Sequence, residues 1–548
     1  MSATFNSSLP RAHWLAAGVA GMAVILSFLL ARWISGTLRP KDFPPGPPII
    51  PGLGNLHQMP IQKPYLKFHE WAKQYGDIVG IKTGTGNLVL LNTPKLVNEL
   101  FDKRGAICSN RPINHILTKH VLPGPEEKSI AILQYDDYYR RWRKSFQFIL
   151  STTGIKRLLP LLEAEASSLC RKFLDGDKDY EQRARHWALA VPLVATTGER
   201  LDDLPADYGE KVCHAQDELL DLILPGAAPP VDIFPILKYV PEFLAKWKGH
   251  ARYVRKCMVD DANNYLIGAK KTYDQIVKDP DSIGFDSLLP KIMKEQAASG
   301  GKEKFTDTEL AFVGQAAVGA AVDTTLATFK NLMVAFAAFP ETLVKAQQEM
   351  DRMAGDGPLK SERLGELKYL KACVSEVLRW RPTTPQGLPH VLTRDERVGE
   401  YFFPKNTMFI ANAWTIHRNE EEYERPNDFM PERFIDNSFG LRPKFKAEDL
   451  ENSGRRVLYA FGSGRRQCPG EQFAFTSVLL AAAKIVWAYD ISPPHGGLDV
   501  SIDTGFKDGT VTQPIHPEVL FRLRDGKRRA GVLADANRTE HVARQLLG

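Results

Sequence analysis

The stretch FGSGRRQCPG, residues 461–470, constrains this 548-residue chain more than any other part of its sequence. Its glycines permit a tight loop, and the Pro-Gly step after Cys468 suits a turn that enters a helix. A thiol at a helix N-terminus faces unpaired backbone N–H groups and the positive end of the helix dipole, which both favour the thiolate. A lone cysteine is most often a packing residue. The loop nevertheless makes Cys468 a candidate metal ligand.

Haem iron suits such a ligand, because electron donation from a thiolate favours cleavage of an O–O bond. Arg466 can then pair with a haem propionate, and Phe461 can shield the ring from water. The six cysteines of the chain are widely spaced and form neither a CxxC zinc pattern nor a disulfide framework. This cysteine usage fits a reducing compartment.

An uncharged run, WLAAGVAGMAVILSFLLA, extends from Trp14 to Ala31. As a helix it is about 27 Å long, which is enough to cross a thin bilayer. More basic residues follow the run than precede it, so the positive-inside rule places the rest of the chain in the cytosol. The alternative is a cleaved signal peptide, but such peptides have shorter apolar cores and a small-residue cleavage site. We therefore predict a retained, single-pass membrane anchor.

Composition excludes some classes of function. Hydrophobic residues make up 43% of the chain, which is enough for a large core. The net charge of +6 is compatible with an anionic membrane surface or an acidic protein partner, although most of it is expected to be solvated surface. No zinc-finger, helix-turn-helix or base-stacking pattern is present, so we predict no nucleic-acid partner.

The chain divides by composition into several segments. Proline-rich KDFPPGPPIIPGLGN follows the anchor and predicts a semi-rigid linker. The polar stretch from Asp525 onward predicts a loosely held tail. The predicted segments are an N-terminal tail (1–13), a transmembrane anchor (14–33), a linker (34–55), a main domain (56–524) and a polar C-terminal tail (525–548).

Residue periodicity predicts mostly helices with a few strands, while length alone favours about three or four domains. The segment DIVGIKTGTGNLVLLN (77–92) is typical of a β-hairpin. Strands are predicted near 388–393 and 399–411. The predicted helices are 94–103, 135–150, 156–175, 309–339, 340–354 and 362–381.

The loop with the lone cysteine resembles the haem-binding loop of the cytochrome P-450 superfamily. The family pattern F-x-x-G-x-R-x-C-x-G is matched in full by Phe461, Gly464, Arg466, Cys468 and Gly470. The resemblance implies a cytochrome P-450 fold, which is mainly α with a small β portion and forms a single large domain after the N-terminal transmembrane helix. It also implies a heme b cofactor whose iron takes its axial thiolate from the cysteine. The ten-residue pattern is highly specific, and three further segments occur in the expected order.

The first of these segments is SEVLRW, in which Glu376 and Arg379 share one face of a helix. PERF follows and supplies Arg433. An isolated ExxR is nearly always a solvated ion pair. The resemblance implies instead a buried structural network of these three side chains beneath the haem loop.

The second segment is VGAAVDTT, residues 318–325, within an Ala-rich helical run. Ordinary tight helix packing would explain the small residues, but polar groups in an apolar run need partners. The segment is similar to the family's A-G-x-(D/E)-T, with Ala321 where glycine is usual. The resemblance assigns Thr324 a hydrogen bond to dioxygen and Asp323 a part in proton relay.

The third segment is YYRRWRKSF, residues 138–146. The family places Trp-x-x-x-Arg here, and the best register puts Tyr139 at the tryptophan position and Arg143 one helical turn later. The resemblance implies that this arginine binds a haem propionate. His390 is a further candidate propionate partner, although a lone histidine is more often a satisfied core side chain.

Two other features leave alternatives open. The apolar, proline-broken segment 224–247 either packs internally or dips into the membrane interface and admits lipophilic compounds. The basic groups at 140–144, with Arg455, Arg456 and Arg465, are either solvated or attract an acidic electron donor.

The resemblance, which covers roughly residues 44–524, implies a membrane-bound monooxygenase that inserts one atom of O2 into a lipophilic small molecule. Similarity to microsomal, fungal-type members implies an endoplasmic reticulum location, with the catalytic domain on the cytosolic side. It also implies a secondary metabolite, such as a terpenoid or polyketide, as substrate. No flavin or dinucleotide fingerprint follows the haem loop, so electrons from NADPH would come through a separate flavoprotein reductase.

Three alternatives remain. The first is a haem-thiolate isomerase or dehydratase that does not need O2, which the pair Asp323 and Thr324 argues against. The second is a non-catalytic haem-binding protein. The third, a membrane scaffold without a cofactor, would require all four motifs to be coincidental.

Overall fold

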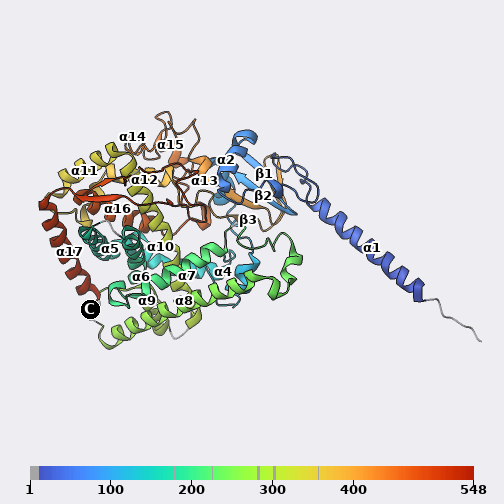
Figure 1. The fold of residues 1–548 in the computed structure, drawn as a ribbon, viewed down its shortest axis with the longest axis horizontal. Helices are drawn as coiled ribbons and strands as arrows, with labels where there is room; N and C mark the ends of the chain where they lie inside the picture. The colour runs from blue at the N-terminus through green and yellow to red at the C-terminus, as the bar shows by residue number, and fades with distance from the viewer. Residues whose placement is uncertain are drawn as a thin grey trace, which may run out of the picture.

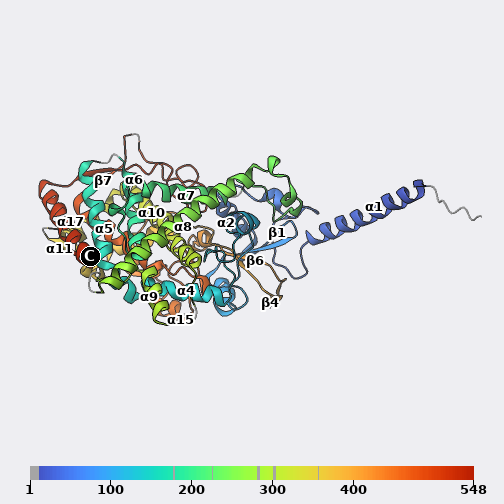
Figure 2. The same ribbon diagram turned by 90° about the horizontal axis from the view of Figure 1, so that it is seen from below.

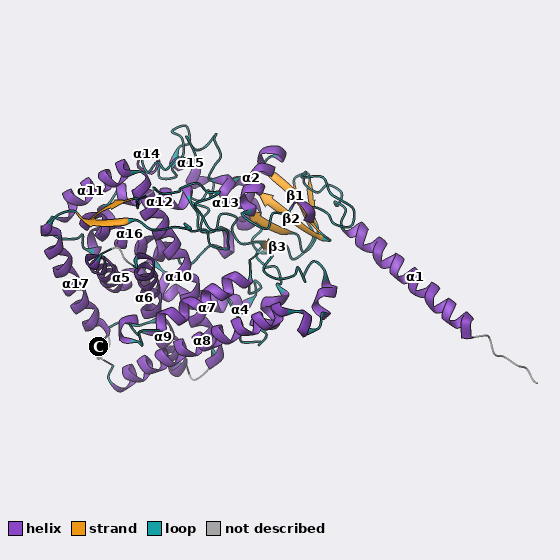
Figure 3. Ribbon diagram, in the orientation of Figure 1, coloured by secondary structure: helices purple, strands orange, loops and turns teal. Residues whose placement is uncertain are grey.

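The computed structural model describes residues 11–176, 179–224, 226–280, 284–299, 304–355, 357–495 and 497–547. Most of the predicted N-terminal tail therefore lies outside the described residues. Helices dominate the described part, and the strands gather mainly beside the base of α1 (Figure 3). The predicted fold class, mainly α with a small β portion, is confirmed.

The α-helices of the described residues are α1 Arg11–Gly36, α2 Pro64–Tyr75, α3 Pro94–Val97, α4 Asp137–Leu150, α5 Thr152–Lys172, α6 Tyr180–Thr197, α7 Tyr208–Leu222, α8 Lys246–Lys278, α9 Leu288–Ala298, α10 Asp307–Ala338, α11 Pro340–Ala354, α12 Tyr369–Trp380, α13 Ala413–Ile416, α14 Arg433–Asp436, α15 Ala447–Asn452, α16 Glu471–Ala488 and α17 Gly526–Leu547. The strands are β1 Ile78–Thr83, β2 Gly86–Leu91, β3 His390–Val391, β4 Glu396–Val398, β5 Tyr401–Phe403, β6 Met408–Ala411, β7 Tyr489–Ser492 and β8 Leu520–Leu523.

The main sheet joins distant parts of the chain. Its strand order is β1-β2-β6-β3, in which β1 and β2 form the predicted hairpin. Strand β6 pairs in parallel with β2, with Leu88 opposite Met408, and β3 pairs antiparallel with β6. Two small hairpins, β4-β5 and β7-β8, complete the β structure of the described residues.

Helix α1 projects away from the rest of the molecule (Figures 1 and 2). Its apolar span Trp14–Gly36 has a mean hydropathy of 2.2 and no buried residues. Among the described residues, α10 and α16 are also long and apolar enough to cross a bilayer, but most of their residues are buried in the core. A helix that is apolar on all sides is expected in a core as well as in a membrane.

Helix α10 forms the centre of the core. Its start is set by a capping box, in which Thr306 and Glu309 satisfy each other's backbone N–H groups. It packs against α6, α8, α12 and α16. The Cys468 loop directly precedes α16, so both regions that carry the predicted chemistry are attached to this core.

The C-terminal segment differs from its prediction. Residues from Asp525 onward were expected to be a loosely held tail, but they form α17, which packs against α5 and α16. Val532 and Ala543 of this helix are buried, and its polar residues form ion pairs with the core. The polar composition therefore reflects charged contacts rather than a loose tail.

Candidate haem-binding site

The loop before α16 closes on itself around Cys468. The backbone N–H of Cys468 donates to the carbonyl of Phe461 at 2.9 Å. Gly464 has a φ of +68°, and a Cβ at this position would lie 2.2 Å from the carbonyl oxygen of Phe101. Only glycine fits both the conformation and the space. Gly470 precedes the first residue of α16.

The Cys468 side chain is accessible to solvent, yet the surrounding protein raises the pKa of its thiol. A side chain that faces a space inside the molecule is accessible and is also surrounded by protein, so the two observations agree. Burial is the main cause of the shift, while a hydrogen bond from the Gly470 N–H and the charge of Arg143 oppose it. Coordination to a metal would remove the thiol proton outright.

Burial and the nearby Arg143 charge lower the pKa of Arg466, which lies in this loop. The guanidinium of Arg466 donates to the backbone carbonyls of Ser109, Ile130 and Leu133, and it stacks on the Tyr139 ring at 3.8 Å. The Tyr139 hydroxyl in turn donates to the Arg465 carbonyl at 3.1 Å. In the described part of the chain, no carboxylate pairs with either guanidinium.

Arg111 was not predicted from the sequence. It is buried and donates to the carbonyls of Ala131, Leu388 and Pro389. Burial and the nearby Arg466 charge lower its pKa to about 9. No motif or periodicity marks this arginine, because it lies in an irregular segment and only the tertiary fold brings it to the site.

His390 is buried beside these arginines. Its ring stacks on Phe101 at 3.7 Å, and Nδ1 lies 2.8 Å from the Cys108 carbonyl oxygen, to which it donates. Burial, Arg111 and Arg466 hold its pKa well below the usual value. Binding to a propionate through Nε2 would therefore require the protonated ring, which a nearby negative charge would favour.

Helix α10 has one accessible stripe within an otherwise buried stretch. Ala317, Ala320, Ala321 and Thr324 are the accessible or half-accessible side chains at helical spacing. The Thr324 hydroxyl donates to the Ala320 carbonyl at 2.9 Å. Small residues on this stripe allow a flat molecule to approach the helix closely.

Asp323 lies next to this stripe but faces the protein interior. It is 6% exposed, and its Oδ2 has no hydrogen-bond partner among the described residues. Burial is the main cause that raises its pKa to about 6. The residue can therefore change its protonation state near neutral pH.

Glu376, Arg379 and Arg433 come together in a buried network. Arg379 forms two hydrogen bonds with the Glu376 carboxylate, at 2.7 and 2.8 Å, and both side chains are fully buried. Arg433 donates to the same carboxylate at 3.1 Å. The remaining donors of Arg379 reach the backbone carbonyls of His417, Pro426 and Asp428.

His417 extends this network to the cysteine loop and was not predicted. Its carbonyl accepts from Arg379, and its Nε2 accepts from the Tyr459 backbone N–H at 2.9 Å. Tyr459 begins the loop that carries Cys468. The network therefore supports the loop through one intervening residue, which no spacing pattern in the sequence could indicate.

These residues fit a haem. Cys468 offers a thiol toward an internal space, and Phe461 is partly buried beside it. Arg111, Arg143 and Arg466 are cationic groups without carboxylate partners among the described residues, which matches the two negative charges of haem propionates. The described residues contain no cluster of histidine, cysteine and carboxylate side chains suited to a metal ion on its own.

Comparisons with known proteins agree with this geometry. The family model named Cytochrome P450 matches residues 44–521. Cytochrome P450 monooxygenase grgG of a Penicillium species is 36% identical over 531 residues, which cover 94% of each chain. A cytochrome P450 monooxygenase of Arthrobotrys oligospora is 30% identical over 96% of this chain and 97% of its own. Cytochrome P450 monooxygenase fogE of Aspergillus ruber is 30% identical over 93% and 94%. The chain therefore belongs to the cytochrome P450 family of haem-thiolate monooxygenases.

Proposed function

We propose that this chain is a membrane-bound enzyme that holds heme b through Cys468 and oxygenates a lipophilic secondary metabolite, such as a terpenoid or polyketide. Its electrons come from NADPH through a separate flavoprotein reductase. The accessible but deeply placed Cys468 thiol, in its closed glycine loop, is the observation that carries this proposal.

The side chains around the loop supply the binding groups. Cys468 would bind the haem iron through its sulfur, and Phe461 would shield the porphyrin from water. Arg466 and Arg143 neutralise the propionates, with Arg111 as a further cation. His390, when its ring is protonated, would donate a hydrogen bond to a propionate through Nε2.

The bound haem supplies thiolate-ligated iron that activates O2, so that one oxygen atom enters the substrate and the other leaves as water. The chain itself must then deliver protons and exclude bulk water. The Thr324 hydroxyl lies on the accessible stripe of α10 and can pass a proton on, while Asp323 can supply it from the interior side.

The surface near α1 supports a lipophilic substrate and a membrane location. Trp33, in the last turns of α1, stacks on Phe234 at 5.8 Å between ring centroids. Ile236, Tyr239 and Phe243 follow in the chain and are 75–82% exposed. This favours the second reading of segment 224–247, in which it meets the membrane interface. Figures 1 and 2 both place the green segment that contains these residues on the side from which α1 projects.

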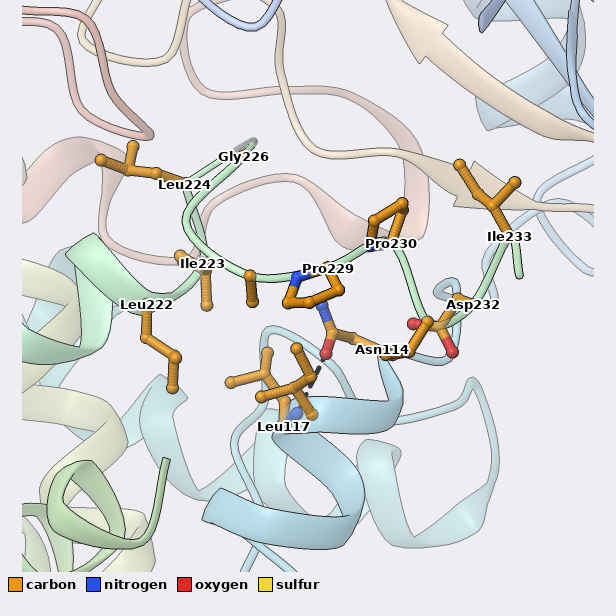
Figure 4. A pocket seen from close by; sticks show the side chains of 13 residues that line it. Asn114, Leu117, Leu222, Ile223, Leu224, Gly226, Pro229, Pro230, Asp232 and Ile233 are labelled. Atoms are coloured by element: carbon orange, nitrogen blue, oxygen red, sulfur yellow. Dashed lines mark hydrogen bonds between the residues drawn. The ribbon is translucent and has the colours of Figure 1, made fainter. Parts of the chain in front are cut away.

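A cavity of about 240 Å³ is lined in part by the same segment of the chain (Figure 4). One wall is formed by residues 222–224, 226 and 228–233. The other contains Leu117 and Asn114, whose side chain accepts from the Leu117 backbone N–H at 2.9 Å. An apolar compound that enters from the bilayer would reach this cavity first.

Part of the basic surface is already neutralised. Arg455 pairs with Glu422 through two bonds of 2.8 Å, and Arg456 pairs with Asp102 at 3.0 Å. Lys144 and Arg465 are exposed and have no carboxylate partner among the described residues. These two cations are the groups we assign to the attraction of an acidic reductase.

The charge pattern around α1 supports a cytosolic catalytic domain, which we assign to the endoplasmic reticulum membrane. Arg32, Arg39 and Lys41 follow the apolar run, so the positive-inside rule places the catalytic domain in the cytosol.

Carbon monoxide spectroscopy tests the proposal directly. The dithionite-reduced full-length protein should show the red-shifted Soret band of a thiolate-ligated haem, and Cys468→Ala should lose it. Microsomes that contain this chain and a reductase should form an oxygenated product only with NADPH. A missing band would refute the proposal, and product formation without NADPH would favour the isomerase or dehydratase alternative.

A further inference from the structure

Two glutamine side chains from different helices meet at Gly319 of α10. Gln216 belongs to α7, and Gln315 lies one helical turn before Gly319 on α10. A Cβ on Gly319 would lie 2.9 Å from the Gln216 Oε1 atom and 3.3 Å from the Gln315 Nε2 atom. A hydrogen-bond acceptor and a hydrogen-bond donor therefore border the same part of the α10 surface, and the glycine leaves room between them.

Both amides have unused hydrogen-bonding capacity. Among the described residues, nothing donates to the Gln216 Oε1 atom, and the Gln315 amide has no hydrogen-bond partner. Gln315 is 7% exposed, yet its amide atoms are not among the fully enclosed unpaired polar atoms. Because α10 is surrounded by other helices, the space that these atoms border lies inside the molecule. Buried polar groups need partners, so the two amides are suited to a polar group of a ligand.

The amide pair borders the accessible stripe of α10. Gly319 is half-accessible, and it directly precedes Ala320, which is exposed although α10 lies in the core. The other side chains of the stripe before Thr324 are alanines, so the two amides are a polar exception in an apolar lining. At 1.5 Å per residue, Gly319 lies about 7.5 Å along the helix from Thr324. A ligand held at the amides can therefore extend along the alanines as far as the residue to which we assign proton transfer.

We propose that Gln216 and Gln315 bind a hydroxyl group of the substrate. The hydroxyl donates to the Gln216 Oε1 atom and accepts from the Gln315 Nε2 atom, with its oxygen packed against Gly319. A hydroxyl satisfies both amides with a single oxygen, whereas a carbonyl can accept from Gln315 alone. A few polar groups in an apolar pocket fix how a ligand is oriented, so the substrate is a lipophilic alcohol or phenol whose oxidised carbon lies several bonds from this hydroxyl. This inference rests on the proposed function and adds the chemical class of the substrate.

Spectral titration of the full-length haem-loaded protein tests the inference with three probes that have equal numbers of heavy atoms: 2-undecanol, 2-undecanone and n-dodecane. The change of the Soret band on binding gives a dissociation constant for each probe, and each variant is compared with the wild type probe by probe. The alcohol can use both amides, the ketone only Gln315, and the hydrocarbon neither. The pattern of losses therefore identifies which hydrogen bond each variant removes.

The two glutamines have different expected signatures. Gln315→Met should weaken binding of the alcohol and the ketone by about fivefold or more, whereas Gln216→Met should weaken binding of the alcohol alone. Neither substitution should weaken binding of n-dodecane, because methionine is an unbranched, flexible side chain that fills the same space without the amide. A second readout uses 2-undecanone with carbon-13 at its carbonyl. Its infrared carbonyl stretch should lie at a lower frequency in the wild type than in Gln315→Met, because the hydrogen bond weakens the C=O bond.

Gln275→Met is the matched control, since Gln275 has an exposed side chain on α8. This variant should bind all three probes as the wild type does. Equal losses for the three probes in Gln216→Met or Gln315→Met would overturn the inference, because they would indicate a general disturbance of the helix packing. Unchanged dissociation constants in both variants, or a wild type that binds none of the probes, would overturn it as well.

The carbon monoxide spectrum separates this inference from the proposed function. A wild type without the thiolate-haem band would refute the proposed function itself. If the wild type shows the band while the two glutamine variants bind the probes as it does, the proposed function stands and only the hydroxyl-binding role of the amides fails.

Discussion

The Thr324 hydroxyl donates to the Ala320 carbonyl, which leaves its oxygen on the accessible stripe of α10. Thr324→Ala keeps the helix and the stripe but removes the proton-bearing group. We expect NADPH oxidation to continue while product per NADPH falls by about tenfold or more, because proton transfer by a positioned group contributes at least this much. The ratio of product to NADPH consumed measures the effect.

Thr328→Val serves as the control for this prediction. Thr328 lies one turn further along α10, is buried, and donates to the Thr324 carbonyl. Because its hydroxyl lies off the accessible stripe, coupling should remain at the wild-type level. Equal coupling in Thr324→Ala and the wild type would remove the proposed role of Thr324.

The Glu376–Arg379 pair gives a residue-level prediction about stability. Arg379→Ala leaves a fully buried carboxylate without its main partner, so the free energy of unfolding should fall by about 3–5 kcal/mol. Urea unfolding, followed by the loss of the thiolate-haem band, measures this change. A fall no larger than that of the control would contradict the buried network.

Arg363→Ala is the matched control for this prediction. Arg363 forms the same kind of ion pair, three residues from Glu366, but on the surface. An exposed pair of this kind contributes little, so no measurable change is expected.

At the scale of residues, the sequence allows a site to be predicted where the pattern that marks it is local. Cys468 with its glycines, and Glu376 with Arg379, are contiguous patterns that can be read in one segment. Arg111 and His417 are different, because their partners are backbone carbonyls and N–H groups from distant segments. Such contacts leave no periodicity in the sequence.

Among the elements, prediction worked best where the hydrophobic period was regular. The hairpin at 77–92 and the helix at 340–354 match the structure closely. The helix expected at 362–381 is divided, because a 3-10 turn at Ser361–Glu366 precedes α12. The strand expected at 399–411 is likewise divided by a turn that contains Asn406, whose φ is +68°.

Helix α17 leads to a prediction at the scale of elements. The Lys484 ammonium is fully buried in α16 and lies 2.7 Å from Asp535 of α17 and 3.3 Å from Glu163 of α5. Asp535→Ala removes the nearer carboxylate from a charge that cannot reach water. The free energy of unfolding should fall by up to about 3 kcal/mol, measured by urea unfolding of the haem-loaded protein.

The control for this prediction is an ion pair near the C-terminal end of α17. Arg544 pairs with the exposed Asp203 at 3.0 Å, so Arg544→Gln should not change the unfolding midpoint. A tail bound only loosely would tolerate both substitutions equally. That result would contradict the structural role of α17.

For the whole molecule, the sequence predicted one domain attached to a membrane anchor, and the structure adds how the two meet. The Trp33 ring lies on Phe234, and its Nε1 donates to the Gly52 carbonyl at 2.8 Å. The end of α1 is therefore in contact with both Gly52 and Phe234. Segment 224–247 alone could not reveal this, because an apolar stretch broken by proline also suits a core.

This arrangement predicts that the domain binds membranes without its anchor. A variant lacking residues 2–31 keeps Trp33 and the exposed side chains Ile236, Phe243 and Leu244, which each contribute about 1.5–3 kcal/mol when buried in an apolar phase. It should therefore still sediment with phospholipid vesicles. Replacing these three side chains with serine in the same variant should weaken vesicle binding by about tenfold or more.

The matched control replaces Ile267 and Val277 with serine, since they are similarly exposed apolar residues on α8. Because α8 carries them away from the surface next to α1, vesicle binding should not change. The thiolate-haem band must be retained in every variant, so that loss of binding is not loss of fold. Equal binding before and after the triple substitution would show that these three side chains do not meet lipid.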